Sequence, residues 1–288
     1  MPQSLREYHS LFLEELRKRK KARSTLLAYG KDVEQFIEMA EKDGNAQPIQ
    51  ITSEIIEKFT TDLQQKRYTN KSVVRKLNSL KTYFTFLRDN GLIEKNPVSR
   101  VTKPKYDHTT PRILSKMEYR ALRDACRGDR RISAVVELLL QTGMRISELA
   151  HLKIEDCDVE KKLLNIRDTE TNQVRTIPMN NAASRVLQEY LSIRPKTREK
   201  TMFVTKTCKP FLVRNIRSAI DRYFRIAGIT GAKVNDLRHT FIVEQLSAGT
   251  PLVYVSQVVG HKRITTTEKY LQFLNKAVDH ASVKIEEL

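Results

Sequence analysis

The sequence predicts a mainly α-helical protein with an N-terminal domain of four helices and a C-terminal helical domain that contains one small β-hairpin. Apolar residues recur three and four positions apart through most of the chain, which is the spacing of one helix face. Strand-like patterns are confined to 163–166 and 174–177, around the turn-like sequence Thr169-Glu-Thr-Asn172. The length of 288 residues suits two domains rather than one.

The first domain is predicted to span residues 1–103 and to be entirely helical. Ser24, Thr52 or Ser53, and Asn70 are of the residue types that cap helix N-termini. The apolar residues form four helical segments, at 5–16, 27–40, 55–63 and 73–87. Asn96-Pro97 ends this helical unit.

A linker is predicted at 104–111, because the stretch around it contains two prolines and no apolar period. The second domain then spans 112–288. Ser115-Lys-Met-Glu118 is a capping-box pattern, and the apolar run 132–140 predicts a buried helix. Further helices are expected at 145–152, 181–191, 213–227, 236–248, 252–259 and, as a short amphipathic tail, 276–288.

The net charge of +18 predicts a polyanionic partner, with nucleic acid as the first candidate and an anionic membrane surface as the alternative. Two predicted helices carry basic residues on one face. A charged helix face is often simply solvated, but the excess of basic residues favours phosphate contact here. The expected DNA-contacting residues are Lys71, Arg75, Lys76 and Lys81 on the fourth helix, and Arg214 and Arg217 on the 213–227 helix.

A cytoplasmic location is predicted from the cysteines and the apolar pattern. The three cysteines are scattered and odd in number, which fits a reducing compartment and argues against both a disulfide framework and a zinc site. No apolar run approaches the roughly 18 residues of a membrane span. The first 23 residues lack the apolar core of a signal peptide.

Four residues supply the groups needed to cleave a phosphodiester without a metal: Arg145, Arg238, His261 and Tyr270. An arginine is always charged and directs two parallel N–H donors at phosphate oxygens. A tyrosine can attack phosphorus, although ionising a phenol of pKa near 10 at neutral pH costs about 4 kcal/mol. Nearby cations and a proton acceptor would offset that cost.

Each of these residues also has an ordinary structural interpretation: a surface arginine, a histidine in a turn, or a half-buried tyrosine on a helix. The surrounding patterns raise the catalytic interpretation above them. His261 follows Gly260 in a predicted turn, where an imidazole can bind a phosphate oxygen or relay a proton. His239 is expected to face away from Arg238, since adjacent residues of a helix do not share a face.

Taken together, these stretches resemble the tyrosine recombinase family, which includes the phage integrases and the Xer-type recombinases. The N-terminal helices resemble the family's core-binding, SAM-like domain, so the resemblance covers nearly the whole chain. The matching pieces are TGMRISELAHLKIED (142–156), NDLRHTF (235–241), VVGHKRITTTEKY (258–270) and, more weakly, VRTIP (174–178). The resemblance implies that Arg145 and Arg238 clamp the phosphate, that His261 assists them, and that Tyr270 is the nucleophile.

The chain departs from the family pattern at two places. Asn235 stands where the family usually has histidine, and an amide cannot exchange a proton at neutral pH. The predicted hairpin turn also lacks the family's lysine, which donates a proton to the leaving 5′ oxygen. Arg167 is the nearest base there, with Lys161 and Lys162 just upstream. An arginine is a poor proton donor because its pKa exceeds 12.

The resemblance implies a site-specific DNA recombinase that cleaves and rejoins strands through a 3′-phosphotyrosyl intermediate. It implies a homotetramer on two double-stranded sites, no metal or other cofactor, and a C-terminal helix exchanged between protomers. One alternative is a relaxing enzyme of the type IB topoisomerase kind, which shares the chemistry but rejoins the same strand. Another is a catalytically silent DNA-binding protein. This alternative is favoured by Asn235 and by the missing hairpin lysine.

Overall fold

Helices dominate both units of the chain, as the apolar spacing predicts, and the mainly α fold class is confirmed. The computed structural model describes residues 4–106, 110–168 and 173–274. The chain divides into two units at Thr109/Thr110, and each is described by itself. Within the described ranges, none of the helices has both the length and the apolar character required to cross a bilayer.

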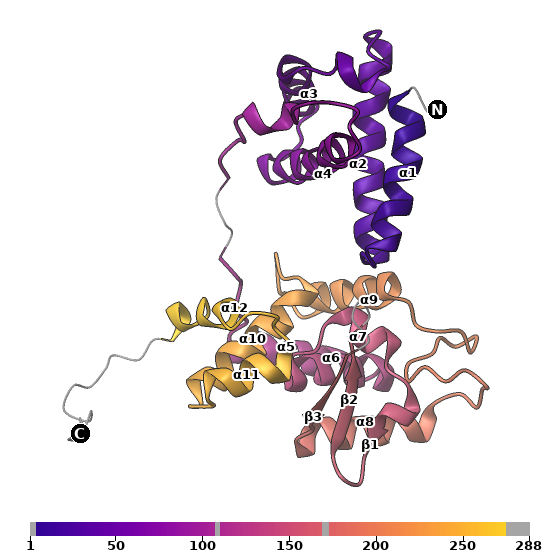
Figure 1. The fold of residues 1–288 in the computed structure, drawn as a ribbon. Helices are drawn as coiled ribbons and strands as arrows, with labels where there is room; N and C mark the ends of the chain where they lie inside the picture. Colours follow the sequence, from indigo (N-terminus) through magenta and orange to yellow (C-terminus); the bar gives the residue numbers. More distant parts are fainter. Residues whose placement is uncertain (1–3, 107–109, 169–172, 275–288) are drawn as a thin grey trace, which may run out of the picture. The chain divides into compact units, whose positions relative to one another are not determined.

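The N-terminal unit contains the four helices expected from its sequence (Figure 1). Ser4 and Thr69 cap the first and the fourth helix, each accepting a hydrogen bond from a backbone N–H of the first turn. Two short 3-10 segments, 48–50 and 97–100, follow the second and fourth helices. The helices are α1 (Leu5–Lys18), α2 (Arg23–Lys42), α3 (Ser53–Gln65) and α4 (Asn70–Asp89).

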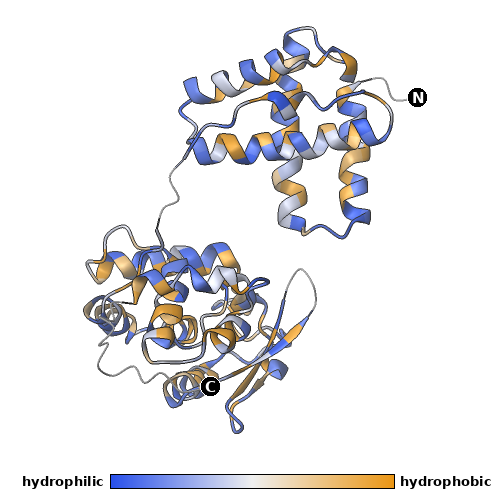
Figure 2. Cartoon of the chain, turned by 60° about the vertical axis from the view of Figure 1, so that its left-hand side comes forward, coloured by the Kyte–Doolittle hydropathy of each residue, from blue (hydrophilic) through white to orange (hydrophobic). Residues whose placement is uncertain are grey.

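Aromatic side chains fill the interior of this unit. Phe36 contacts both Phe59 and Phe84 edge to face, with ring centroids 5.4 and 5.7 Å apart. The buried hydroxyl of Tyr83 donates to the backbone carbonyl of Leu5 at 2.7 Å, which ties α4 to the start of α1. Each helix carries hydrophobic and hydrophilic stretches (Figure 2), and the hydrophobic ones supply this core.

The sequence analysis placed Lys76 on the exposed face of α4, and this is wrong. Lys76 is only 6% exposed, and its ammonium group donates to Asp32 Oδ1 at 2.9 Å and to Gln35 Oε1 at 2.6 Å. Arg75 and Ser79 bind the other oxygen of the same buried carboxylate. A lysine at a core position of α4 is tolerated because a carboxylate on α2 lies opposite it. Lys71 and Lys81 are exposed, as expected.

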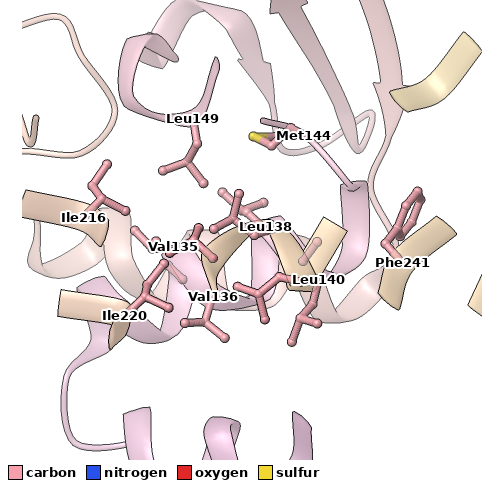
Figure 3. Close-up of a cluster of buried hydrophobic side chains, with 14 of the residues drawn as sticks. Val135, Val136, Leu138, Leu140, Met144, Leu149, Ile216, Ile220 and Phe241 are labelled. Atoms are coloured by element: carbon pink, nitrogen blue, oxygen red, sulfur yellow. The ribbon is translucent and has the colours of Figure 1, made fainter. Parts of the chain in front are cut away.

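The second unit is built around α6, which packs against α5, α7, α8, α9 and α10. Figure 3 shows its side chains, including Val135 and Leu138, between Ile216 and Ile220 of α9 and Phe241 of α10. The helices are α5 (Lys116–Cys126), α6 (Arg130–Thr142), α7 (Ile146–His151), α8 (Asn181–Ile193), α9 (Val213–Ile226), α10 (Val234–Ser247), α11 (Leu252–Val259) and α12 (Thr265–Glu268). The expected tail helix at 276–288 lies outside the described residues.

The predicted hairpin forms as β2 (Leu163–Arg167) and β3 (Val174–Pro178), which pair antiparallel with Leu164 opposite Ile177. A two-residue strand, β1 (Cys157–Asp158), adds to the other edge of β2. The sequence analysis missed β1, which is too short for alternation to be visible. Alternation does place Ile166 and Ile177 in the core, and Arg175, which pairs with Ile166, lies on the same face of the hairpin.

Candidate active site

Arg145 stands at the N-cap of α7, where the sequence predicted a helix start. Gly143 precedes it with φ of 60°, a left-handed conformation that glycine adopts at little cost and that ends α6. The carboxylate of Glu148, three residues further on, accepts from the Arg145 backbone N–H at 2.7 Å and from its Nη1 at 2.9 Å. The guanidinium is therefore held at the start of the helix by its own capping residue.

Glu148 also receives a second guanidinium, that of Arg175 on β3. Arg175 donates through Nη1 and Nη2 at 2.9 and 2.8 Å, and its Nε donates to the carbonyl of Val258 at 2.8 Å. Glu148 is only 3% exposed, and burial by itself would raise its pKa, but Arg175 and Arg145 hold that pKa below the ordinary value. The buried carboxylate of Glu148 thus links α7 to β3, and Arg175 extends the link to Val258 at the end of α11.

Arg238 lies on α10 and is 5% exposed. Its Nη1 donates to the carbonyl of Gly143 at 2.7 Å, just ahead of Arg145. Arg145 in turn donates through Nη2 to the carbonyl of Gly260 at 2.9 Å. Burial, together with the positive charge of Arg145, lowers the pKa of Arg238 to about 10, so the guanidinium stays charged at neutral pH. The two arginines, 93 positions apart in the sequence, therefore meet at one place.

Tyr270 follows α12 and is 6% exposed. Its hydroxyl oxygen lies 2.6 Å from Nδ1 of His239. Burial raises the pKa of the phenol, whereas the charge of Arg238 acts in the opposite direction. The phenol is thus desolvated, next to a cation and hydrogen-bonded to an imidazole.

His261 begins the turn that leads from α11 to α12. Its Nδ1 lies 2.7 Å from Oγ1 of buried Thr267, and its ring lies nearly parallel to that of Tyr270, with centroids 6.3 Å apart and planes at 14°. Burial, followed by the charges of Arg238 and Arg145, lowers the pKa of His261 to about 4. The imidazole is neutral at pH 7 and can exchange hydrogen bonds with an anion beside it.

Asn235 and His239 lie one helical turn apart on α10. The Asn235 amide nitrogen is 2.8 Å from Nε2 of His239, and the other ring nitrogen of His239 contacts the Tyr270 hydroxyl. The three side chains therefore form a continuous row of contacts. His239 was expected to face away from Arg238 and to support the site only indirectly, but its Nδ1 lies 2.6 Å from the Tyr270 hydroxyl oxygen. Tyr270 is therefore hydrogen-bonded to His239, and the charge of Arg238 acts on the same phenol.

A cavity of about 550 Å³ opens beside this cluster. Arg217 of α9 and Lys233, which precedes α10, line it together with Asn235 and Arg238. Arg217 is thus beside the arginine pair, whereas Arg214 is one turn away on the exposed surface of α9. Among the described residues, no three His, Cys, Asp or Glu side chains gather in a way that would hold a metal ion.

Arg167, the basic residue expected to serve the leaving group, ends β2. Its side chain is half exposed, and its Nη2 lies 3.9 Å from Oδ1 of Asp156. The Nζ atom of Lys161 lies 3.5 Å from Oδ2 of Asp158, and Nζ of Lys162 donates to Oδ1 of Asn181 at 2.8 Å. The hairpin turn itself, 169–172, lies outside the described residues.

The structure brings together the four predicted residues, and it adds two that the sequence analysis missed: Glu148 and Arg175. Both were inside stretches that carried the family resemblance. Glu148 stands three residues after an expected helix start, the position of a capping acid. Arg175 is the single basic residue of β3, but its partner on α7 is 27 positions away in the sequence, and no local period reveals it.

Comparisons with known proteins show the family of the chain. The sequence model of the phage integrase family matches residues 112–276, and that of the phage integrase N-terminal SAM-like domain matches residues 10–91. The tyrosine recombinase XerC of Roseiflexus castenholzii is 30% identical over 270 residues, which cover 89% of this chain and 85% of that protein.

Solved structures are similar as well. The crystal structure of XerA recombinase aligns with a TM-score of 0.54 at 29% identity, over 92% of this chain and 93% of that one. A lambda integrase tetramer bound to a Holliday junction aligns with a TM-score of 0.76 over 98% of this chain and 80% of that one. Its identity is 18%, so the likeness concerns the fold.

Proposed function

The chain belongs to the phage integrase family and is a tyrosine recombinase, and from this premise we propose how its own residues perform the reaction. Arg145 and Arg238 hold the scissile phosphate between them. Tyr270 attacks the phosphorus, and His261 binds a non-bridging oxygen. Glu148 and Arg175 keep Arg145 in position.

One observation carries this assignment: both arginines are anchored to backbone carbonyls at the site of the other catalytic groups. Arg238 is bound to Gly143, next to Arg145, and Arg145 is bound to Gly260, next to His261. A guanidinium has five N–H donors. In the described part of the chain, one donor of Arg238 is used to bind Gly143. Its other N–H groups can bind the anion that forms during attack.

Attack by the Tyr270 oxygen forms the tyrosyl–phosphorus bond and breaks the bond to the 5′ oxygen. The product is a 3′-phosphotyrosine and a free 5′-hydroxyl. The 5′-hydroxyl of a partner duplex then attacks the same phosphorus and releases the tyrosine. Because the phosphotyrosyl bond conserves the energy of the broken linkage, no nucleotide cofactor is required.

We propose that Lys233, rather than Arg167, donates the proton to the leaving 5′ oxygen. Lys233 lines the same cavity as Arg238 and Asn235, whereas Arg167 is directed at Asp156. An ammonium can give up a proton far more readily than a guanidinium. A substrate with sulfur in place of the leaving 5′ oxygen needs no such proton. We therefore expect this substitution to restore cleavage by Lys233→Met but not by Arg238→Lys.

Double-stranded DNA is the proposed partner, engaged by Lys71, Lys81, Arg75, Arg214 and Arg217. We propose a homotetramer on two sites, in line with the lambda integrase tetramer, and exchange of the segment 276–288 between protomers. Truncation after Asn275 is then expected to leave binding to one site intact and to impair the pairing of two sites, measured by native gel shift. We also propose a cytoplasmic location, which the three free cysteines support.

The assignment of Tyr270 is tested with DNA that traps the intermediate. A duplex selected from a random library by binding to the whole protein is nicked close to the cleavage position, so that the short 5′-hydroxyl fragment diffuses away. Wild-type protein should accumulate as a covalent adduct that peptide mapping locates at Tyr270. Tyr270→Phe should bind the duplex normally without forming the adduct. An adduct at another tyrosine would refute the assignment.

A further inference from the structure

The mechanism above leaves one step without a residue, the removal of the phenol proton. Two histidines lie against the Tyr270 ring, and they differ in what they contact. His239 Nδ1 is 2.6 Å from the hydroxyl oxygen. His261 is stacked on the ring instead, and its Nδ1 is directed at Thr267. The hydrogen bond to the reacting oxygen therefore belongs to His239.

We propose that His239 is the proton acceptor for the Tyr270 phenol and that Asn235 holds its imidazole in the accepting tautomer. The inference rests on the proposed function, in which Tyr270 is the nucleophile. His239 touches the reacting atom and is thus a catalytic residue. Asn235 acts through His239 and is a positioning residue.

In the structure the amide nitrogen of Asn235 faces Nε2 of His239, and the proposed tautomer requires the amide to be turned by 180° about its terminal bond. An imidazole whose Nε2 carries the proton leaves Nδ1 with a lone pair toward Tyr270. Asn235 stabilises that tautomer when its carbonyl oxygen, rather than its NH₂ group, faces Nε2. The two ends of an amide are isosteric, so the 2.8 Å contact accommodates this orientation. Asn235 cannot accept a proton itself, but it can orient His239, one turn further along α10, to accept the proton of Tyr270.

The proton and electron count closes within named groups. As the oxygen of Tyr270 bonds to phosphorus, its O–H bond breaks and the proton binds Nδ1 of His239. The imidazolium then donates through Nε2 to the Asn235 oxygen. The bond from phosphorus to the 5′ oxygen breaks in the same step, and that oxygen takes a proton from the ammonium group of Lys233. When a 5′-hydroxyl attacks the phosphotyrosine, its proton returns to the neutral amine of Lys233, and the phenolate leaves and takes the other proton back from Nδ1.

The charges around His239 favour a neutral imidazole that is ready to accept. Burial lowers the pKa of His239 below its ordinary value, Arg238 lowers it as well, and Asp236 opposes them. Tyr270 and His261 face it from the segments beyond α11. The lowered pKa keeps the imidazole neutral at neutral pH, and its capacity to accept a proton is lost as the pH falls through its pKa.

The test follows the rate of adduct formation on the nicked, library-selected duplex between about pH 5 and 9. Wild-type protein should show a rate that is flat at neutral and alkaline pH, with an acid limb that lies below the ordinary histidine pKa of about 6.5. His239→Gln should be slower at pH 7 by about 100-fold or more. Its rate should then rise about tenfold per pH unit, as the ionised fraction of a phenol does. His151→Gln, at an exposed position on α7, is the control and should keep the wild-type profile.

Variants at exposed Asn235 test the positioning role with the fold preserved. Asn235→Asp should raise the pKa of His239 and shift the acid limb of the profile upward by about one pH unit. Asn235→Leu should shift the limb downward and lower the plateau. A merely structural role would change the rate without moving the limb in opposite directions, and such a result would overturn the proposal.

A second measurement needs no variant. Nitrogen NMR of wild-type protein labelled in its histidines reports which ring nitrogen of His239 carries the proton. We expect Nε2–H at neutral pH, and Nδ1–H would contradict the inference. The proposed function and the role of His239 fail on different results. If wild-type protein forms no Tyr270 adduct, the proposed function fails. If it does and His239→Gln reacts at the same rate with the same pH profile, the role of His239 alone fails.

Discussion

Arg145 and Gly260 are joined by a hydrogen bond of 2.9 Å from the guanidinium Nη2 to the backbone carbonyl oxygen. Gly260 ends α11 with φ of 71° and is followed directly by His261. A Cβ at this position would lie 2.9 Å from Cζ of Arg175. The turn that presents His261 therefore also sets the position of both arginines that Glu148 binds.

Gly260→Ala should accordingly impair cleavage as well as stability. A left-handed alanine costs about 1–2 kcal/mol, and displacement of Arg175 adds to this. We expect adduct formation to fall by about 100-fold, the scale of losing one donor to a developing anion. Gly249→Ala is a matched control, because Gly249 has φ of 87° and no atoms within 4 Å of the added carbon. It should lose only the conformational cost of the left-handed alanine and keep its cleavage rate. Equal cleavage by both variants would contradict this reading of the turn.

Glu148→Gln should separate the charge of Glu148 from its shape. Glutamine has nearly the same volume, but its NH₂ group would face guanidinium donors and leave them without an acceptor. We expect a loss of about 2 kcal/mol in the free energy of unfolding and a fall in cleavage of about 100-fold. The readouts are urea unfolding and single-turnover adduct formation.

Glu137→Gln is the control for that loss. Glu137 is also buried and also accepts two hydrogen bonds from one arginine, Arg123. It should therefore lose comparable stability, yet it should cleave at nearly the wild-type rate. If Glu148→Gln cleaves as well as Glu137→Gln does, the carboxylate is not needed to orient Arg145.

Local patterns predicted the helices of both units, because each buries one face and apolar spacing records that face in the sequence. The four residues of the phosphate site were also predictable, since each lies inside a stretch whose order along the chain resembles a known family. The partners of those residues were not. The bonds from Arg175 to Glu148 and from His239 to Tyr270 join segments that only tertiary packing brings together. Lys76 was misplaced for the same reason, because its acceptor Asp32 lies 44 positions away.

Arg238→Lys should abolish most cleavage while charge is retained. A lysine has a single nitrogen and cannot bind the carbonyl of Gly143 and two phosphate oxygens together in the same geometry. We expect a loss of at least about 100-fold in adduct formation, with DNA affinity changed little. Arg194→Lys is the control, since Arg194 also binds backbone carbonyls, those of Met202, Glu199 and Thr201, away from the site. A wild-type rate for Arg238→Lys would place the clamp elsewhere.

The two lysines Lys76 and Lys81 of α4 should respond to substitution in opposite ways. Lys81 is exposed, so Lys81→Glu should leave the free energy of unfolding unchanged and weaken DNA binding. The slope of log affinity against log salt should become shallower by about one, as expected when one phosphate contact is lost.

Lys76→Met should behave differently, because it leaves the Asp32 carboxylate buried with only Arg75 and Ser79. Removing one partner of a buried ion pair costs about 3 kcal/mol. We therefore expect a lower urea midpoint for Lys76→Met and an unchanged salt slope for the fraction that remains folded. A lower salt slope without loss of stability would mean that the ammonium group of Lys76 leaves Asp32 to bind DNA.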